Sequence, residues 1–125
     1  MAIKVSRTRI DFGTAGMRNY AETVNALGNV SGATAIDYSL GSVITATATG
    51  TVSWSVTNPA ASGKASSFTL VLTNGGTAVQ TWMSGTKWPE GVAPTLTASG
   101  IDILSFFSTD GGTTWYGVLA MTNSS

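Results

Sequence analysis

A chain of 125 residues, of which 42% are hydrophobic, is long enough for a single domain around one hydrophobic core. Only 10% of the residues are charged and the net charge is zero, which argues against nucleic acid as the main partner, because phosphate binding needs a basic surface. The chain contains no cysteine and no histidine, so disulfides, thiolate chemistry, Ser-His or Cys-His triads and the usual zinc sites are excluded.

The few charges are distributed unevenly along the chain. Residues 1–20 contain one acidic residue, Asp11, and four basic residues: Lys4, Arg7, Arg9 and Arg18. Residues 21–125 contain two basic and five acidic residues, so a segment of net charge +3 precedes a body of net charge −3. Such a segment is either a solvated tail, a tail folded back on its own acidic body, or an arm that docks on an acidic neighbour. At full extension it spans roughly 60–70 Å.

No part of the sequence predicts a membrane segment. No apolar stretch approaches the roughly 18 residues that cross a bilayer. Residues 1–10 are polar and basic and lack the apolar centre of a signal peptide. We therefore expect a soluble protein that is made in the cytosol and has no membrane partner.

From about residue 22 the sequence predicts short strands separated by turns. Apolar residues alternate with serine and threonine at the period of two that is typical of strands. The expected strands cover residues 24–30, 36–40, 43–49, 52–56, 68–73, 79–83, 101–108 and 113–121. No amphipathic run of helix length occurs. The pattern predicts an all-β fold, an antiparallel β-sandwich or jelly-roll-like domain over residues 21–125, with residues 1–20 as an extended N-terminal arm.

Turn residues divide the expected strands. Asn74-Gly75-Gly76 and Asp110-Gly111-Gly112 each predict a hairpin turn. In the second turn we expect the Asp110 side chain to bond backbone amides and at least one glycine to adopt positive φ. Two prolines within residues 87–94 predict a rigid loop in place of a central strand, with Trp88 packed on the body.

The sequence offers no catalytic constellation. Ser84 lacks the first glycine of a nucleophile elbow, and Gly63-Lys64 lacks the flanking residues of a phosphate loop. No pair among the six acidic residues is singled out for glycoside hydrolysis. Asp102 lies in an apolar strand and is expected to face outward. We expect no enzyme activity, no cofactor and no metal site.

Aromatic residues are the remaining candidates for a binding surface. They form either a platform that stacks on sugar rings or a core and a subunit interface, and the second interpretation carries more weight because large aromatics dominate buried contacts in β domains. The candidates are Trp54, Phe68, Trp82, Trp88, Phe106, Phe107, Trp115 and Tyr116.

One pattern in the sequence is more specific. It begins with Lys87-Trp88-Pro89-x-Gly91-x-Ala93-Pro94 and ends with Asp110-Gly111-Gly112-x-x-Trp115-Tyr116-Gly117. Together with the upstream segment Asn58-Pro59-x-x-Ser62-Gly63-Lys64, it resembles a β-rich module of tailed-bacteriophage virion proteins, over about residues 24–118. The resemblance implies a virion location, a homotrimer and no catalytic residues. The module occurs at the ends of tail and fibre proteins and also in small virion proteins.

The module is nearly the whole chain, which favours a capsid decoration, or cement, protein over a fibre. In this interpretation the arm clamps an acidic patch of the major capsid protein, and the oligomeric β body seals a junction on the capsid exterior of a virion whose proteins are made in the host cytoplasm. The alternative is a tail-fibre or tail-tip module that binds host-surface carbohydrate through Trp88, Trp115 or Tyr116. The predicted partner-binding residues are Lys4, Arg7, Arg9, Arg18, Trp88, Trp115 and Tyr116.

Overall fold

The computed structural model describes residues 13–124, and its regular elements are strands and single-turn 3-10 helices. The strands are β1 (Val24–Asp37), β2 (Val43–Thr57), β3 (Ser66–Thr73), β4 (Gln80–Thr81), β5 (Thr86–Lys87), β6 (Ile101–Ser108) and β7 (Trp115–Ser124). The 3-10 helices are η1 (Tyr38–Leu40), η2 (Gly75–Thr77) and η3 (Pro89–Gly91). The all-β prediction is confirmed. Within residues 13–124, no helix has the length and hydropathy needed to cross a membrane.

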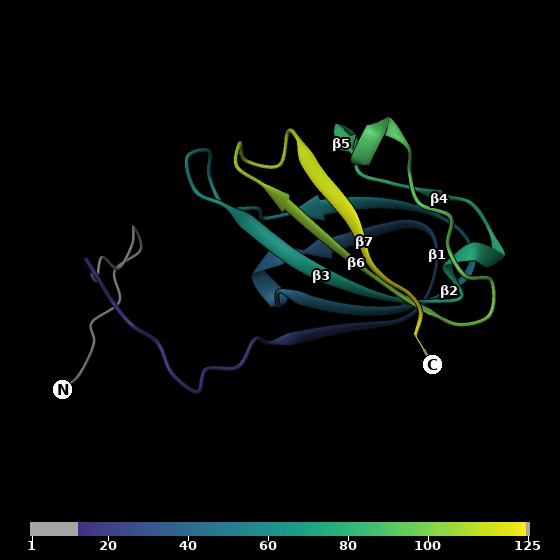
Figure 1. Ribbon diagram of the computed structural model, residues 1–125, viewed down its shortest axis with the longest axis horizontal. Helices are drawn as coiled ribbons and strands as arrows, with labels where there is room; N and C mark the ends of the chain where they lie inside the picture. Colours follow the sequence, from purple (N-terminus) through teal and green to yellow (C-terminus); the bar gives the residue numbers. More distant parts are fainter. Residues whose placement is uncertain (1–12, 125) are drawn as a thin grey trace.

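All seven strands belong to one mixed sheet. Neighbouring strands follow the order β1-β2-β3-β6-β7-β5, and β4 pairs with β2 (Figure 1). The pairs β3–β6 and β6–β7 are antiparallel, whereas β1–β2, β2–β3, β2–β4 and β5–β7 are parallel. The prediction of antiparallel pairing is therefore wrong for the first half of the body, and the strands form a single sheet in place of two separate ones.

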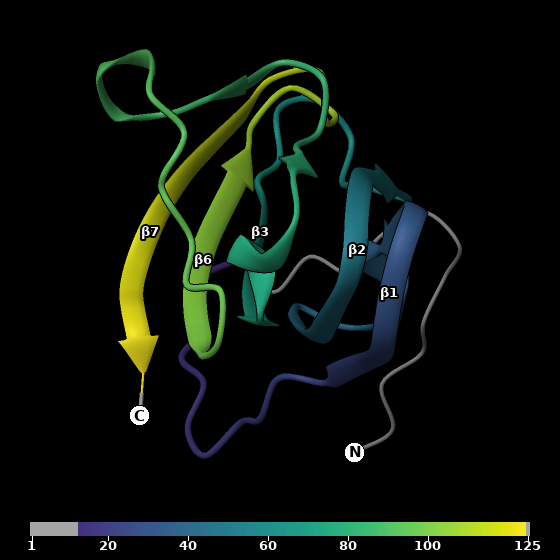
Figure 2. The same ribbon diagram turned by 90° about the vertical axis from the view of Figure 1, so that its right-hand side faces the viewer.

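A bend within the long strands explains the parallel pairing. Parallel neighbours ordinarily need a crossover of about a dozen residues, but only the short segment 38–42 separates β1 from β2. The register of β1 against β2 shifts at Gly28 and Gly32, and both glycines have a φ of +70°. Both strands curve back on themselves in this region (Figures 1 and 2). The chain thereby returns to its starting point, where the Ser42 N–H donates to the Thr23 carbonyl at 3.2 Å.

The hydrophobic core lies between the two halves of this folded sheet. One half consists of β3, β6, β7 and the first parts of β1 and β2. The other half consists of β4 and the second parts of β1 and β2. Alternate residues of each strand face inward. Ile44, Leu70 and Leu104 form one row in register across β2, β3 and β6, and each is fully buried. Each such side chain contributes about 1.5–3 kcal/mol on burial.

An aromatic cluster fills the same interior. Phe68 stacks on Phe106 with ring centroids 5.1 Å apart, and Trp115 meets Phe68 edge-on at 5.4 Å. Trp88 approaches Phe106 at 5.5 Å, which confirms that it packs on the body. A Cβ atom on Gly117 would lie 2.8 Å from the Trp88 ring and 2.9 Å from the Phe106 ring, so only glycine leaves room for this contact.

Of the two hairpins predicted at glycine-rich turns, the structure confirms one and contradicts the other. β6 and β7 pair across the second turn, where Gly111 and Gly112 have φ of +72° and +86°. The Thr114 N–H donates to Asp110 Oδ1 at 2.9 Å, so this hairpin is confirmed. The hairpin predicted at residues 74–76 is wrong, because β3 and β4 both pair with β2 and not with each other. The Asn74-Gly75-Gly76 segment instead connects β3 to β4, and both of these strands lie parallel to β2.

Replacing Gly111 and Gly112 by valine is expected to lower the free energy of unfolding by about 1–3 kcal/mol, because a β-branched residue is strained at positive φ. Chemical denaturation measures the loss. Thr113→Val, an exposed position in the same turn, is the control and is expected to be close to neutral. Unchanged stability of the glycine variant would contradict the assigned turn geometry.

Candidate functional site

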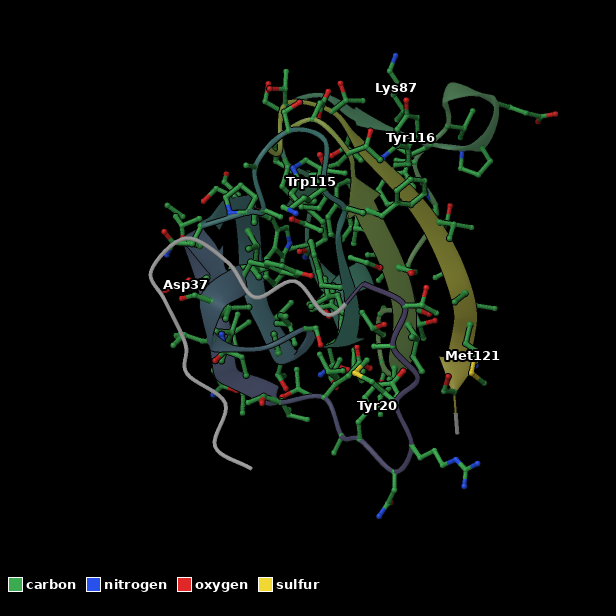
Figure 3. The ribbon with its side chains drawn as sticks, turned by 90° about the vertical axis from the view of Figure 1, so that its left-hand side faces the viewer. Tyr20, Asp37, Lys87, Trp115, Tyr116 and Met121 are labelled. Atoms are coloured by element: carbon green, nitrogen blue, oxygen red, sulfur yellow. The ribbon has the colours of Figure 1, made fainter. Side chains whose placement is uncertain are left out.

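The segment before β1 projects from the body. Residues 13–23 form no strand, and every one of them is exposed (Figure 1). Met17 and Tyr20 are 72% and 67% exposed, and Arg18 lies between them in the sequence. Figure 3 shows Tyr20 on this segment, outside the folded sheet. The other three basic residues of the predicted arm, Lys4, Arg7 and Arg9, lie outside the described residues.

A broad uncharged surface covers the outward-facing side of the sheet. It starts on β7 and continues in register across β6, β3, β2 and the first part of β1. We call it the outer surface, and its members are Val24, Ala26, Val43, Thr45, Thr47, Ser67, Thr69, Val71, Thr73, Ile101, Ile103, Ser105, Phe107, Tyr116, Val118 and Met121. None of these side chains carries a charge, so the surface suits contacts made by shape and apolar area.

Large apolar side chains gather at the β6–β7 side of the outer surface. Phe107 and Tyr116 are paired across the two strands, and their rings stack at 5.2 Å. Phe107, Tyr116, Val118 and Met121 are between 44% and 53% exposed. Single exposed apolar residues are ordinary, but a contiguous group of them marks a site of interaction.

The aromatic residues predicted to bind a partner do not share one surface. Trp115 and Tyr116 are consecutive in β7, so they point to opposite sides of the sheet. Trp115 is 1% exposed and lies in the interior between the halves of the sheet, whereas Met121 projects outward from β7 (Figure 3). The expectation that Trp115 contacts a partner does not fit this position. Trp88 is half-buried against the core, and of the three only Tyr116 belongs to the outer surface.

Asp102 is a buried carboxylate, and the expectation that it faces outward is wrong. It lies opposite Leu72 on the inward side of β6 and is 0% exposed. Its Oδ2 accepts from the Thr97 N–H at 2.6 Å, and its Oδ1 accepts from the Asn123 N–H at 3.0 Å. The hydroxyls of Thr97 and Thr122 also donate to Oδ1. Burial works against ionisation, but these hydrogen bonds outweigh it, so the pKa of Asp102 lies below its ordinary value.

Two further carboxylates with lowered pKa values, Asp37 and Asp110, lie at turns. Asn58 and Ser39 donate to Asp37, and their hydrogen bonds lower its pKa. The backbone N–H of Thr114 is the main cause of the lowered pKa of Asp110. The hydrogen bonds of these carboxylates hold neighbouring chain segments in place, so both carboxylates have a structural role. Within residues 13–124, no group of three or more acidic side chains lies close enough together to hold a metal ion.

The hollow beside the η2 turn offers no free polar side chain at Gln80 to a small ligand. It has a volume of about 240 Å³ and lies beside Trp82 and Gln80. Gln80 already uses both ends of its amide, since Oε1 accepts from Trp54 Nε1 at 2.8 Å and Nε2 donates to the Gly75 carbonyl at 3.1 Å. The amide therefore fixes Trp54 and the η2 turn, and it is not directed at a ligand.

Comparison with protein-family models, with curated proteins and with solved structures gave no match for this chain. Its geometry combines two features that suit macromolecular contact. One is the exposed N-terminal segment with Met17, Arg18 and Tyr20, and the other is the uncharged outer surface. The sequence signal for the segment was its basic charge, whereas the Phe107–Tyr116 pair was identified only as part of a longer set of aromatics.

Proposed function

We propose that this chain is a non-enzymatic structural protein of a bacteriophage virion, and specifically a capsid decoration protein. Its N-terminal arm clamps an acidic patch of the major capsid protein, and a homotrimer of β bodies covers a junction on the capsid exterior. The observation that carries the proposal is the projecting segment with its exposed Met17 and Tyr20. The resemblance of residues 24–118 to a virion module supports the same assignment.

The composition of the arm fits a docking role. Burying a side chain the size of Met17 or Tyr20 against a partner contributes about 1.5–3 kcal/mol, which neither residue gains while it is exposed. The net charge of +3 over residues 1–20 adds attraction to an acidic partner. An arm of this kind combines an apolar anchor with electrostatic steering.

The outer surface supports the second part of the proposal, an oligomeric body. Interface cores are depleted in charged residues and enriched in Tyr, Phe and Met. The outer surface has no charge and has Phe107, Tyr116 and Met121 at one side. Threefold and quasi-threefold junctions of a shell accept a cyclic trimer by symmetry.

Deleting residues 1–20 is expected to reduce capsid affinity by more than about tenfold, because the apolar anchor and the basic charges are lost together. Co-sedimentation with capsids that lack the protein measures the effect. Binding by the full chain is expected to weaken with increasing salt, since exposed charge contacts are screened.

A matched control removes two positive charges from the body. Lys64 and Lys87 are exposed and lie outside the arm, so Lys64→Ser with Lys87→Ser is expected to leave capsid affinity unchanged. If the deletion left affinity unchanged, the arm would not be the clamp. If the control lost as much affinity as the deletion, general charge would explain binding.

A tail-fibre or tail-tip module that binds host carbohydrate is the second candidate. The observation that favours it is the stacked, half-exposed pair of Phe107 and Tyr116, because aromatic rings offer flat apolar contact area. Copy number per virion, measured by quantitative mass spectrometry, separates the two functions. A number comparable with that of the major capsid protein supports decoration, and a few copies in multiples of three or six support the tail.

A further inference from the structure

Two of the long strands, β1 and β7, have an open edge in the sheet. β1 pairs with β2 on one side and has no partner strand on its other side among residues 13–124. β7 pairs with β5 only at Trp115 and Tyr116, so its edge is open over residues 117–124 within the same described range. Figure 2 shows β1 and β7 at opposite sides of the molecule, with β2, β3 and β6 between them.

Neither edge has the lysine or proline that commonly shields an edge strand, although register shifts interrupt the pairing of both β1 and β7. Proteins shield edge strands with lysine, proline or inward-pointing charges, because unpaired N–H and C=O groups bind other strands. β7 has no charged residue and no proline, and the only charge on β1 is Asp37, its last residue. Exposed small or apolar positions occur along both edges: Ala26, Ala33 and Ala35 on β1, and Val118 and Met121 on β7. The exposed polar positions Asn29, Thr122 and Asn123 are uncharged.

We infer that copies of this chain join edge to edge, with β7 of one copy paired to β1 of the next copy. The strand that covers each edge then belongs to a second copy. Apart from Asp37 at the end of β1, both edges are uncharged, so they match each other and offer no complementary charge to a charged partner. The outer surface would also continue across the seam, where Val118 and Met121 meet Val24 and Ala26. Two different edges joined head to tail form a heterologous interface, which gives a ring when the rotation between copies closes and an open filament when it does not. A trimer is the closed case. This inference rests on the trimer of the proposed function.

Edge-blocked variants test the seam. Ala26→Lys with Ala33→Lys blocks β1 with one lysine on each side of its bend, and Val118→Lys with Met121→Lys blocks β7. All four positions are exposed in the single copy, so the body is expected to fold. Ser53→Lys with Ser55→Lys is the matched control, because these exposed positions lie on the central strand β2.

Native mass spectrometry, with circular dichroism to confirm folding, distinguishes the arrangements. The unmodified chain and the Ser53/Ser55 control are expected to be trimers, and each blocked variant alone a monomer. A mixture of the two blocked variants is expected to give a one-to-one heterodimer, since it offers one open β7 edge and one open β1 edge. A dimer of the β1-blocked variant alone would overturn the inference in favour of β7 pairing with β7. A monomeric unmodified chain, or trimers of both blocked variants, would also overturn it.

Hydrogen exchange on the unmodified trimer gives a second readout that needs no substitution. Amides of β1 and of residues 117–124 are expected to exchange more slowly in the trimer than after dilution to monomers, because edge amides are protected only when paired. Equally fast exchange in both forms would overturn the inference. Capsid co-sedimentation of the same variants tests the proposed function separately, since a monomer that still binds through its arm shows that the seam alone is lost.

Discussion

Replacing Trp115 by alanine is expected to lower the free energy of unfolding by about 3–5 kcal/mol, the usual cost of removing a large aromatic side chain from a core. Trp115 is 1% exposed and packs edge-on against Phe68 at 5.4 Å. Its loss leaves a cavity between the two halves of the sheet that the neighbouring strands cannot close without moving. Urea denaturation, followed by circular dichroism, measures the change.

Tyr116→Ala is the matched comparison, because it removes the next aromatic residue of the same strand. Tyr116 is 44% exposed and stacks only on the equally exposed Phe107. We expect a loss of less than about 1 kcal/mol in the single copy. Equal losses at Trp115 and Tyr116 would contradict the assignment of the two residues to opposite sides of β7.

Replacing Asp102 by alanine is expected to cost about 3 kcal/mol or more. The substitution leaves the N–H groups of Thr97 and Asn123 without the acceptor that they have in the interior, and each donor left unsatisfied away from water costs about 1–3 kcal/mol. The 92–100 loop and the end of β7 would both be released, because Asp102 joins them to β6. Asp102→Asn is expected to lose less, since one oxygen remains, and Glu90→Gln is its control at an exposed position.

The lowered pKa of Asp102 also predicts a dependence on pH. A carboxyl whose pKa is lower in the folded state than in the unfolded state adds stability above its unfolded pKa, and this stability is lost as pH falls through the folded pKa. Asp37 and Asp110 have shifts of the same sign. Stability is therefore expected to fall below about pH 4. In unfolding measured at pH 6 and pH 3, Asp102→Asn is expected to flatten this dependence, and an unchanged slope would contradict the assignment.

The sequence predicted the strands better than their partners. Alternation of apolar and polar residues depends on the strand itself, so most expected strands are present. Strand direction depends on where a connection leads, and a short connection after a straight strand gives a hairpin. The bends at Gly28 and Gly32 change that outcome for β1, and nothing local in the sequence distinguishes them from other glycines.

Candidate site residues were harder to assign because β6 and β7 have apolar residues on both faces. In β6 the residues on each side of Asp102 are isoleucines, so periodicity alone cannot show which face is the core. The same ambiguity applies to Trp115 and Tyr116. Tyr116 pairs with the outward-facing Phe107, which places Trp115 on the opposite, inward side of β7. The N-terminal arm was predicted from its charge, a property of composition and not of long-range contacts. In the part of it that the structure describes, residues 13–20 are exposed and form no strand.

The curved strands β1 and β2 make the first half of the body a short solenoid, in which each turn of chain lies only against the turn next to it. In such structures stability is approximately a sum of nearest-neighbour terms. Within a single copy, β2 is the only strand of residues 13–124 that pairs with the outermost turn, β1, so β1 is expected to open at a lower free energy than the central strands. A load applied through residues 13–23 reaches this turn first, so β1 is expected to unwind locally while β2 and the strands beyond it stay folded.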